Sequence, residues 1–338
     1  MMRSEELKVS FALYEEGLSI LQGEERDAVE WLWGYYVNIL NKDGNALAAE
    51  TGIDRSTLTT LLSGARMLMG GSRQEAFDAV AILKKRVLKN MPLVRTITAK
   101  KILDTLDYAR DEQAMTYISG TTGRGKTMTA QYWAAQNNHG RTHYVRCPSD
   151  CSRRSLVLLL AASFGISSSG NIGDKERALA RHINSRHVLI IDEAGHLLSK
   201  SGNPRGPIEF IRDLHDLTHC GVCLIFTDVY LNEIKRGKNA AYFEQFLGRL
   251  ECPCEIPPVV RKDEVRSIVR AFAPDANETF VDYALTIARG RDGKRRTLFK
   301  DFYRARDFSK ERGEKLTVQT LKKMVAFRLS GGVWPEDE

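Results

Sequence analysis

Hydrophobic residues follow two different patterns along this chain, and the change between them predicts its organisation. Residues 1–92 and 258–330 carry apolar residues at the spacing of amphipathic helices. Residues 93–257 instead carry short apolar runs separated by helix-compatible stretches, a pattern typical of a parallel sheet covered on both faces. We therefore expect an α/β core between an N-terminal all-α domain and a C-terminal helical lid, followed by an acidic tail at 331–338.

The individual elements can be placed from the same pattern. Five runs are predicted as core strands: residues 114–118, 142–146, 188–191, 221–227 and 254–256. Core helices are predicted at residues 98–108, 128–136, 155–164, 175–184, 207–218 and 242–250. Flanking helices are predicted at residues 5–21, 25–40, 73–89, 263–271, 277–289, 297–310 and 318–329. Gly70, Gly71 and Ser72 predict a break before the third of these flanking helices, and residues 90–92 predict a linker after it.

Residues 45–62 have the spacing of a helix-turn-helix unit. Ala48 is small where two helices would cross, Gly52 suits the turn, and Asp54 is a good N-cap for the second helix. Outward-facing residues of that helix are the predicted contacts with duplex DNA: Arg55, Ser56, Thr57 and Thr59. A small helical packing domain without a DNA role is the alternative, because the pattern reports mainly packing.

The stretch after the first predicted strand reads GTTGRGKT and fits the motif G-x-x-x-x-G-K-[ST]. Glycines let the backbone wrap closely around a phosphate, and the N-terminus of the following helix adds N–H donors. Lys126 is expected to reach the β- and γ-phosphates, and Thr127 to ligate Mg²⁺. We therefore predict ATP and Mg²⁺ as cofactors. The predicted nucleotide-binding residues here are Gly120, Thr121, Thr122, Gly123, Arg124, Gly125, Lys126, Thr127 and Met128.

The third predicted strand ends in two adjacent carboxylates. Asp192 stands where the strands of α/β sheets bind ligands, and it is predicted to hold Mg²⁺ directly or through water. Glu193 follows and is predicted to polarise the attacking water as a general base. An acidic turn without catalytic function is the weaker alternative, given the phosphate-binding motif upstream. Asp228, at the end of the fourth strand, is a candidate for orienting the water.

The net charge of +7 is unevenly distributed. Residues 1–92 hold 11 Lys/Arg against 13 Asp/Glu, and the remainder holds 39 against 30. The basic excess suggests a polyanion partner such as nucleic acid, with ordinary solvated charge as the alternative. Two basic stretches outside the helix-turn-helix supply further predicted contacts with DNA phosphates: Arg153, Arg154, Lys200 and Arg205.

Other features of the composition exclude several classes of protein. There is no run of about eighteen apolar residues and no apolar leader, so a cytoplasmic protein without a membrane span is expected. The six cysteines are expected to be reduced and mostly buried, with a zinc site left open as the less favoured alternative.

The order of the motifs resembles that of an AAA+ ATPase. The phosphate-binding loop, the IIDEAGHL stretch, the FLGRL stretch and the helical lid carry this resemblance, and the helix-turn-helix narrows it to the phage Mu transposition protein B family. The resemblance implies ATP hydrolysis, a homo-oligomeric ring or helical filament on double-stranded DNA, and delivery of target DNA to a transposase. An ATP-switched helix-turn-helix regulator of transcription or phage defence, and an assembly ATPase without a DNA role, remain as alternatives.

The resemblance also implies roles for single residues. Lys126, Glu193 and Arg249 would be catalytic, with Arg249 as an arginine finger, and Arg296 would be the sensor-two residue. Arg295 is equally well placed for that last role. Thr227-Asp228 departs from the Gly-Asn more usual at sensor one.

Overall fold

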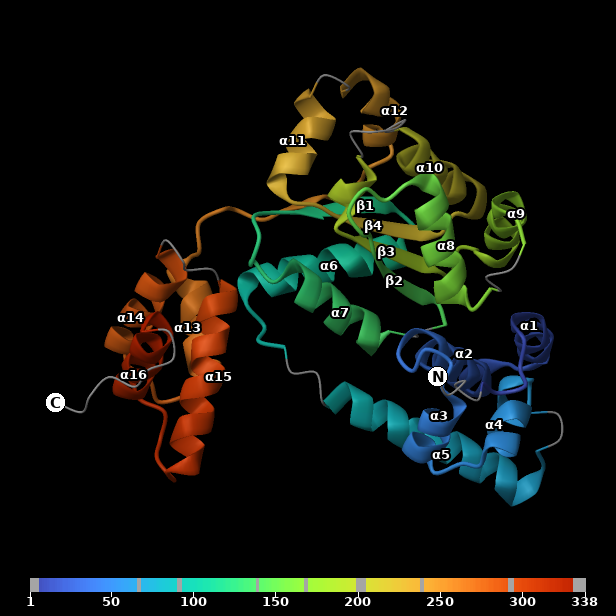
Figure 1. Ribbon diagram of the computed structural model, residues 1–338, viewed down its shortest axis with the longest axis horizontal. Helices are drawn as coiled ribbons and strands as arrows, with labels where there is room; N and C mark the ends of the chain where they lie inside the picture. The colour runs from blue at the N-terminus through green and yellow to red at the C-terminus, as the bar shows by residue number, and fades with distance from the viewer. Residues whose placement is uncertain are drawn as a thin grey trace. The chain divides into compact units, whose positions relative to one another are not determined.

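The described part of the chain contains a five-stranded sheet (Figure 1). The computed structural model describes residues 6–65, 68–89, 93–137, 140–166, 170–198, 205–237, 240–290 and 295–330. The strands are β1 (Met115–Ser119), β2 (Thr142–Arg146), β3 (Val188–Asp192), β4 (Gly221–Ile225) and β5 (Cys254–Glu255). They are arranged in the order β2-β3-β4-β1-β5, and β1–β5, β2–β3 and β3–β4 pair in parallel. The predicted five-stranded parallel sheet is thus confirmed.

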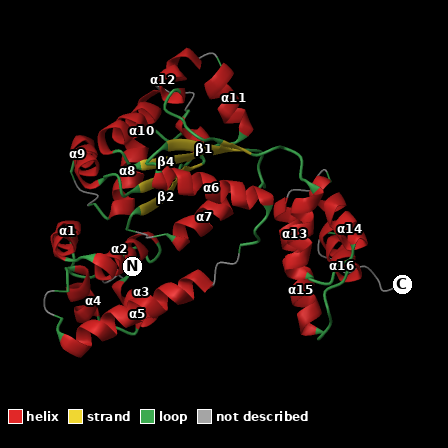
Figure 2. Ribbon diagram, turned by 180° about the vertical axis from the view of Figure 1, so that it is seen from behind, coloured by secondary structure: helices red, strands yellow, loops and turns green. Residues whose placement is uncertain are grey.

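Helices cover both faces of this sheet, which explains why its strands are continuous apolar runs. All five residues of β1, β3 and β4 are buried. The chain crosses the sheet in one direction from β1 to β2 and then returns through β3 to β4. Because such crossovers are right-handed, α7 (Lys126–Gln136) lies on the opposite face from α8 (Arg153–Phe164) and α10 (Arg205–Thr218), as Figure 2 shows.

The remaining helices follow the sequence pattern with four differences, the first of which is that the helix predicted at residues 5–21 begins only at Phe11. Their bounds are α1 (Phe11–Ile20), α2 (Gly23–Asn38), α3 (Gly44–Thr51), α4 (Arg55–Leu62), α5 (Gly70–Lys89), α6 (Ile97–Asp111), α9 (Ile172–His182), α11 (Asp228–Arg236), α12 (Glu244–Leu247), α13 (Lys262–Phe272), α14 (Glu278–Arg289), α15 (Arg295–Glu311) and α16 (Val318–Leu329). The predicted break at residues 70–72 is wrong, because α5 begins at Gly70. The predicted helix at 242–250 is also wrong: a short 3₁₀ turn precedes the four-residue α12, which Gly248 ends.

Helix α11 was not predicted, although its sequence carries the signals of a helix. Leu231 and Ile234 are its buried face, Asp228 stands in its first turn, and two cations stand in its last turn. The strand predicted at residues 221–227 includes the residue that immediately precedes this helix. Thr227 is in fact the N-cap residue of α11, and β4 ends at Ile225.

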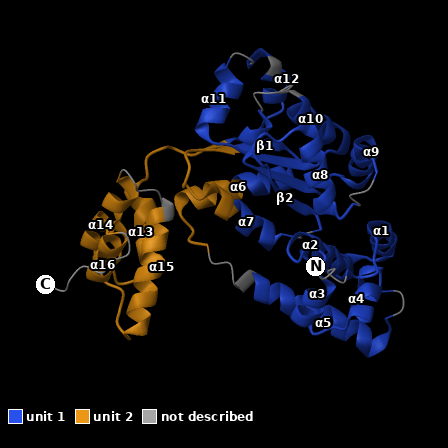
Figure 3. Ribbon diagram, viewed as in Figure 1, with its two compact units in different colours: residues 1–92, 105–117, 130–253 blue, residues 93–104, 118–129, 254–338 orange. Residues whose placement is uncertain are grey.

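The contacts divide the chain into two compact units, coloured separately in Figure 3. The first comprises residues 1–92, 105–117 and 130–253. The second comprises residues 93–104, 118–129 and 254–338, and it therefore joins the phosphate-binding motif to the C-terminal helices. The predicted domain limits at residues 92 and 257 stay predictions.

In the second unit, helices α13 to α16 enclose a core of their own. It is built around Val265, Phe280, Phe302 and Leu321, all of which are buried. Asp301 is a fully buried carboxylate of this core, and the Arg328 side chain binds both of its oxygens at 3.0 and 3.2 Å. The apolar periodicity of residues 258–330 therefore corresponds to a four-helix lid.

In the first unit, the N-terminal helices build an apolar core and also pack against α8. Trp33 of α2 is buried, its ring stacks on Tyr14 at 4.4 Å, and its indole N–H donates to the Phe164 carbonyl oxygen at 3.2 Å. Gly165, the residue that caps α8, lies so close to the Trp33 ring that a Cβ at this position would be 2.7 Å from it. Residues 6–65 are thus joined to the sheet by buried contacts rather than by a tether.

Glu30 is the charged centre of this N-terminal contact. Its carboxylate is 5% exposed and binds Arg26 of its own helix at 3.2 Å. Arg186, which precedes β3, binds it at 3.3 Å, and Arg141, which precedes β2, also contacts it. One buried carboxylate therefore binds guanidinium groups from three separate parts of the sequence.

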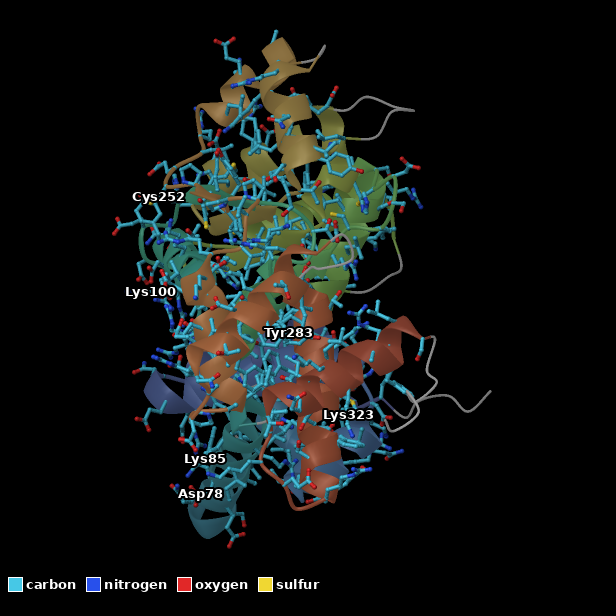
Figure 4. All side chains as sticks on the ribbon, turned by 90° about the vertical axis from the view of Figure 1, so that its left-hand side faces the viewer. Asp78, Lys85, Lys100, Cys252, Tyr283 and Lys323 are labelled. Atoms are coloured by element: carbon cyan, nitrogen blue, oxygen red, sulfur yellow. The ribbon has the colours of Figure 1, made fainter. Side chains whose placement is uncertain are left out.

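All six cysteines are reduced, and five of them are buried. Cys252, labelled in Figure 4, is exposed in the loop before β5. In the described part of the chain, no three His, Cys, Asp or Glu side chains gather as a metal site requires. Nor is any helix there both long and apolar enough to span a bilayer.

Replacing Glu30 by Gln should lower the free energy of unfolding by about 1–3 kcal/mol, because a neutral amide cannot satisfy three guanidinium groups at a buried position. Urea unfolding followed by tryptophan fluorescence measures this. Glu24→Gln on the same helix is the matched control, since Glu24 is exposed, and it should change stability by less than about 0.5 kcal/mol. Equal effects of the two substitutions would contradict the importance of the Glu30 cluster.

Candidate nucleotide and DNA site

The predicted phosphate-binding loop spans residues 120–125, between the end of β1 and the first residue of α7. Gly123 and Gly125 have φ values of 84° and 85°, which residues with a Cβ rarely adopt. Gly120 lies against Ile256, so that a Cβ at Gly120 would stand 2.8 Å from the Ile256 Cβ. The glycines thus allow the strand–loop–helix turn, and the N-terminus of α7 opens at the loop as an anion site requires.

The Lys126 side chain lies back along this loop and is 8% exposed. Its ammonium group donates to the carbonyl oxygens of Gly120 at 2.5 Å and Thr121 at 3.1 Å. The ammonium is therefore already held within the turn that is predicted to hold the phosphates. Thr122 and Met128 are exposed, and Thr127 is half-buried.

Arg124, predicted as part of the nucleotide-binding loop, has its side chain elsewhere. It is 4% exposed and forms an ion pair with Glu264 of α13, with 3.0 Å between Nη2 and Oε2. Only the backbone of Arg124 is placed in the loop as the motif predicts, and the use of its side chain was not visible in the sequence pattern.

Asp192 is the last residue of β3, and its carboxylate is oriented by two donors. The residue is 2% exposed. Its Oδ2 accepts a hydrogen bond from the Tyr144 hydroxyl at 2.6 Å, and its Oδ1 accepts from the Glu193 backbone N–H at 2.8 Å. Burial and the neighbouring Asp192 charge raise the pKa of Tyr144 above its ordinary value, so that the hydroxyl stays a donor. Tyr144 was missed in the sequence, because a tyrosine in a strand normally indicates only packing.

Glu193 has a strained backbone. Its φ of 54° and ψ of 36° lie in the left-handed region, which is uncommon for a residue with a long side chain. Its carboxylate is 33% exposed and lies 3.4 Å from an Arg146 guanidinium nitrogen. Strain of this kind is stored preferentially at functional sites. The left-handed turn sends the chain away from the strand immediately after Asp192, so adjacent carboxylates are held in different surroundings.

Other residues expected at the site have defined positions. Asp228 is the first residue of α11, and its role as sensor one stays a prediction. Arg249 is exposed, and its guanidinium binds both carboxylate oxygens of Asp216 at 3.0 and 3.2 Å. This ion pair lowers the pKa of Asp216. Arg249 therefore pairs with a residue of α10 and not with the glutamates that flank it in sequence. The side chains of Arg295 and Arg296 lie outside the described residues.

The helices of the predicted helix-turn-helix, α3 and α4, are joined by residues 52–54. Gly52 has a φ of 73°, and the Asp54 carboxylate caps α4 by accepting from the Ser56 and Thr57 N–H groups. The Ser56 and Thr57 hydroxyls also donate to Asp54. Arg55 donates to Asn45 and to the Glu6 carbonyl oxygen, and Thr59 donates to the Arg55 carbonyl oxygen. These predicted DNA-contact side chains are therefore engaged locally, and their role on DNA stays a prediction.

The basic stretches predicted to contact phosphates differ from one another. Arg153 begins α8, binds Glu176 at 2.9 and 3.0 Å and stands 5.3 Å from the Phe210 ring centroid. Arg154 is exposed. Lys200 lies outside the described residues, as does the Arg205 side chain at the start of α10. Of the adjacent arginines at 153 and 154, Arg154 is therefore the better candidate for a phosphate contact.

Comparisons with known proteins agree with this architecture. The family model described as an AAA domain matches residues 109–234. The Mu-like prophage FluMu DNA transposition protein B of Haemophilus influenzae is 24% identical over 274 residues, which cover 78% of this chain and 91% of that protein. The ATP-dependent target DNA activator B of Escherichia phage Mu is 25% identical over 181 residues, 53% of this chain, and the match spans about half (55%) of that relative's length.

Among solved structures, a mutant of Thermotoga maritima RuvB is 14% identical, with a TM-score of 0.42, and the match covers 75% of this chain and 73% of that one.

The strand–loop–helix turn at residues 120–127, the carboxylate that ends β3 and the AAA-domain match at residues 109–234 define the class of protein: the chain is an ATPase, an enzyme that binds and hydrolyses ATP, with an AAA domain at its core. Within that class it resembles the DNA transposition protein B family of phage Mu, as the order of its motifs predicted.

Tyr144→Phe should raise the Mg²⁺ concentration needed for half-maximal ATP hydrolysis by about tenfold, because Asp192 loses the donor that orients its carboxylate. Tyr108→Phe is the matched control: its hydroxyl donates at 3.0 Å to the carboxylate of Glu251, a pair on the surface. This control should leave the Mg²⁺ dependence unchanged. A Tyr144→Phe enzyme with the Mg²⁺ dependence of the wild type would exclude Tyr144 as a support for the metal ligand.

Proposed function

We propose that this ATPase acts in DNA transposition: in its ATP-bound form it assembles on duplex DNA and delivers that DNA to a transposase. The observation that carries the proposal is the similarity to the Haemophilus DNA transposition protein B across 78% of this chain. The printed name of the phage Mu relative adds ATP dependence and activation of target DNA.

The distribution of charge supports a polyanion partner. Residues 258–330 hold 18 Lys/Arg against 10 Asp/Glu, whereas residues 93–257 hold 21 against 17. The larger part of the basic excess therefore lies in the C-terminal lid, where exposed cations include Lys322 and Lys323, the latter labelled in Figure 4. Contacts of this kind bind phosphates with little sequence preference and weaken steeply with salt.

The proposed roles in ATP hydrolysis follow from the chemistry of each side chain. Lys126 and the backbone N–H groups of residues 120–125 would bind the phosphates. The hydroxyl of Thr127 and the carboxylate of Asp192 are hard oxygen ligands of the type that Mg²⁺ prefers, so these residues would hold it. When bound, Mg²⁺ supplies positive charge to the β- and γ-phosphate oxygens. Glu193 would accept the proton of the attacking water.

Arg249 is the proposed arginine finger, acting on ATP held by a neighbouring subunit. Its ion pair with Asp216 lies on the surface, and exposed ion pairs of this kind are weak and screened by salt. The guanidinium can therefore exchange this partner for a phosphate when a second subunit docks. A homo-oligomer, either a ring or a filament, follows from a site completed in this way.

An ATP-switched regulator is the second candidate, favoured by one observation. The α3–α4 pair has a left-handed Gly52 in its turn and an Asp54 cap, which are the local features of a helix-turn-helix. A regulator would bind one operator with high affinity, whereas the proposed transposition ATPase binds all duplexes alike.

Lys126→Ala and Glu193→Gln should separate nucleotide binding from turnover. Lys126→Ala removes the phosphate-binding cation and should abolish both ATP binding and ATP-dependent DNA binding. Glu193→Gln should still bind ATP but hydrolyse it about two to four decades more slowly, and it should therefore remain on DNA longer. Titration with a fluorescent ATP analogue measures nucleotide affinity, and phosphate release measures turnover. Fluorescence anisotropy on several unrelated duplexes, at two salt concentrations, measures DNA binding.

Three outcomes of that experiment would contradict the assignments. Unchanged ATP affinity in Lys126→Ala would contradict the phosphate-binding role. Wild-type turnover in Glu193→Gln would mean that another residue activates the water. High affinity for a single duplex sequence would favour the regulator.

Arg249→Ala should lower ATP turnover by about three to five decades while leaving ATP binding intact. Mixed with the Lys126→Ala protein, it should regain part of the activity, because some interfaces then combine an intact phosphate loop with an intact arginine. Asp216→Asn is the matched control: it breaks the same ion pair but keeps Arg249, and it should remain active. Normal turnover of Arg249→Ala, or no recovery on mixing, would contradict the role between subunits.

A further inference from the structure

The side chain of Arg124 leaves the phosphate-binding loop and enters the protein interior. Its neighbours Gly123 and Gly125 both have positive φ and offer the loop little conformational restraint of their own. Arg124 is 4% exposed, and its guanidinium meets the Glu264 carboxylate at 3.0 Å. The restraint on this stretch of loop therefore comes from a long side chain fixed at its far end.

Glu264 lies in the first turn of α13 and is 1% exposed. Its Oε2 receives Arg124, and its Oε1 accepts from the Thr98 backbone N–H at 3.2 Å and from the Thr98 hydroxyl. Thr98 belongs to the first turn of α6 and is itself buried. One carboxylate thus joins the phosphate-binding loop, the first lid helix and the start of α6, all within the second compact unit.

The charged residues that precede Glu264 on α13 lie at the surface. Lys262 and Asp263 are half-exposed or exposed and make surface ion pairs, Lys262 with Glu278 at 3.2 Å and Asp263 with Arg266 at 2.7 Å. Glu264 is the charged residue of this turn that lies in the interior. Burying a carboxylate and a guanidinium is costly unless they are paired, so the arrangement constrains both partners to one geometry.

We propose that Glu264 is a positioning residue for ATP: through Arg124 it holds the phosphate-binding loop in shape and couples that shape to lid helix α13. The proposal rests on the proposed assignment of residues 120–127 as the phosphate site. Because such coupling is reciprocal, nucleotide binding acts on the lid through the same pair.

A double-mutant cycle in the full-length protein tests this proposal. Glu264→Gln and Arg124→Gln should each weaken ATP affinity by about tenfold or more, because small displacements of positioning groups have large effects. At saturating ATP, turnover should change by less than about threefold. The double variant should bind ATP no more weakly than the worse single variant, since both substitutions break one connection.

Arg328→Gln is the matched control for damage to the lid. It breaks the buried Asp301–Arg328 ion pair, which lies in the same lid but does not touch the loop. It should lower the melting temperature as Glu264→Gln does, yet leave the dissociation constant for ATP within about twofold. If Glu264→Gln fails to fold, Glu264→Asp keeps the charge but shortens the reach, and it should weaken ATP binding in a folded protein.

Each other result overturns the proposal. If Arg124→Gln weakens binding but Glu264→Gln does not, Arg124 contacts the nucleotide by itself. If neither substitution alters ATP affinity, or if their effects simply add, the pair serves folding alone. The Lys126→Ala variant distinguishes failure of this proposal from failure of the phosphate-site assignment, because that variant would bind ATP normally only if the assignment were wrong.

Discussion

Parallel pairing of the five strands is the constraint on which the rest of this protein depends. Parallel strands need a crossover between each pair, so the chain must supply a helix after almost every strand and cover both faces of the sheet. The crossovers also put the carboxyl ends of all strands at one edge. The phosphate-binding loop follows β1 there, and Asp192 ends β3 there, although 72 positions separate Gly120 from Asp192 in the sequence.

What could be predicted from the sequence was local. The glycine-rich loop, the carboxylates after an apolar run and the five strands each depend on a short pattern, and the structure has the sheet and its loop at those positions. Tyr144, Glu264 and the Asp216 partner of Arg249 could not be predicted, because each acts across a distance in sequence that no periodicity encodes. Helix α11 was a different failure: its apolar face was visible in the sequence, but no element was predicted for residues 229–241, and its N-cap residue Thr227 was taken as the end of the preceding strand.

The buried contacts of the N-terminal helices bear on how the chain works as a whole. Trp33 and Glu30 belong to α2, yet their partners lie at the end of α8 and before β2 and β3. A truncated chain beginning near residue 93 would leave these partners facing water. The N-terminal helices are therefore structural components of the first compact unit, whatever they contact on DNA.

The exposed Cys252 gives the protein a natural reporter. The other five thiols are buried, so a maleimide dye would attach at this one position in the native chain without any substitution. Cys252 lies three residues after Arg249, in the loop that leads into β5. Donor and acceptor dyes on separate batches of protein would thus report, by energy transfer, the moment at which the Arg249 region of one molecule comes close to another.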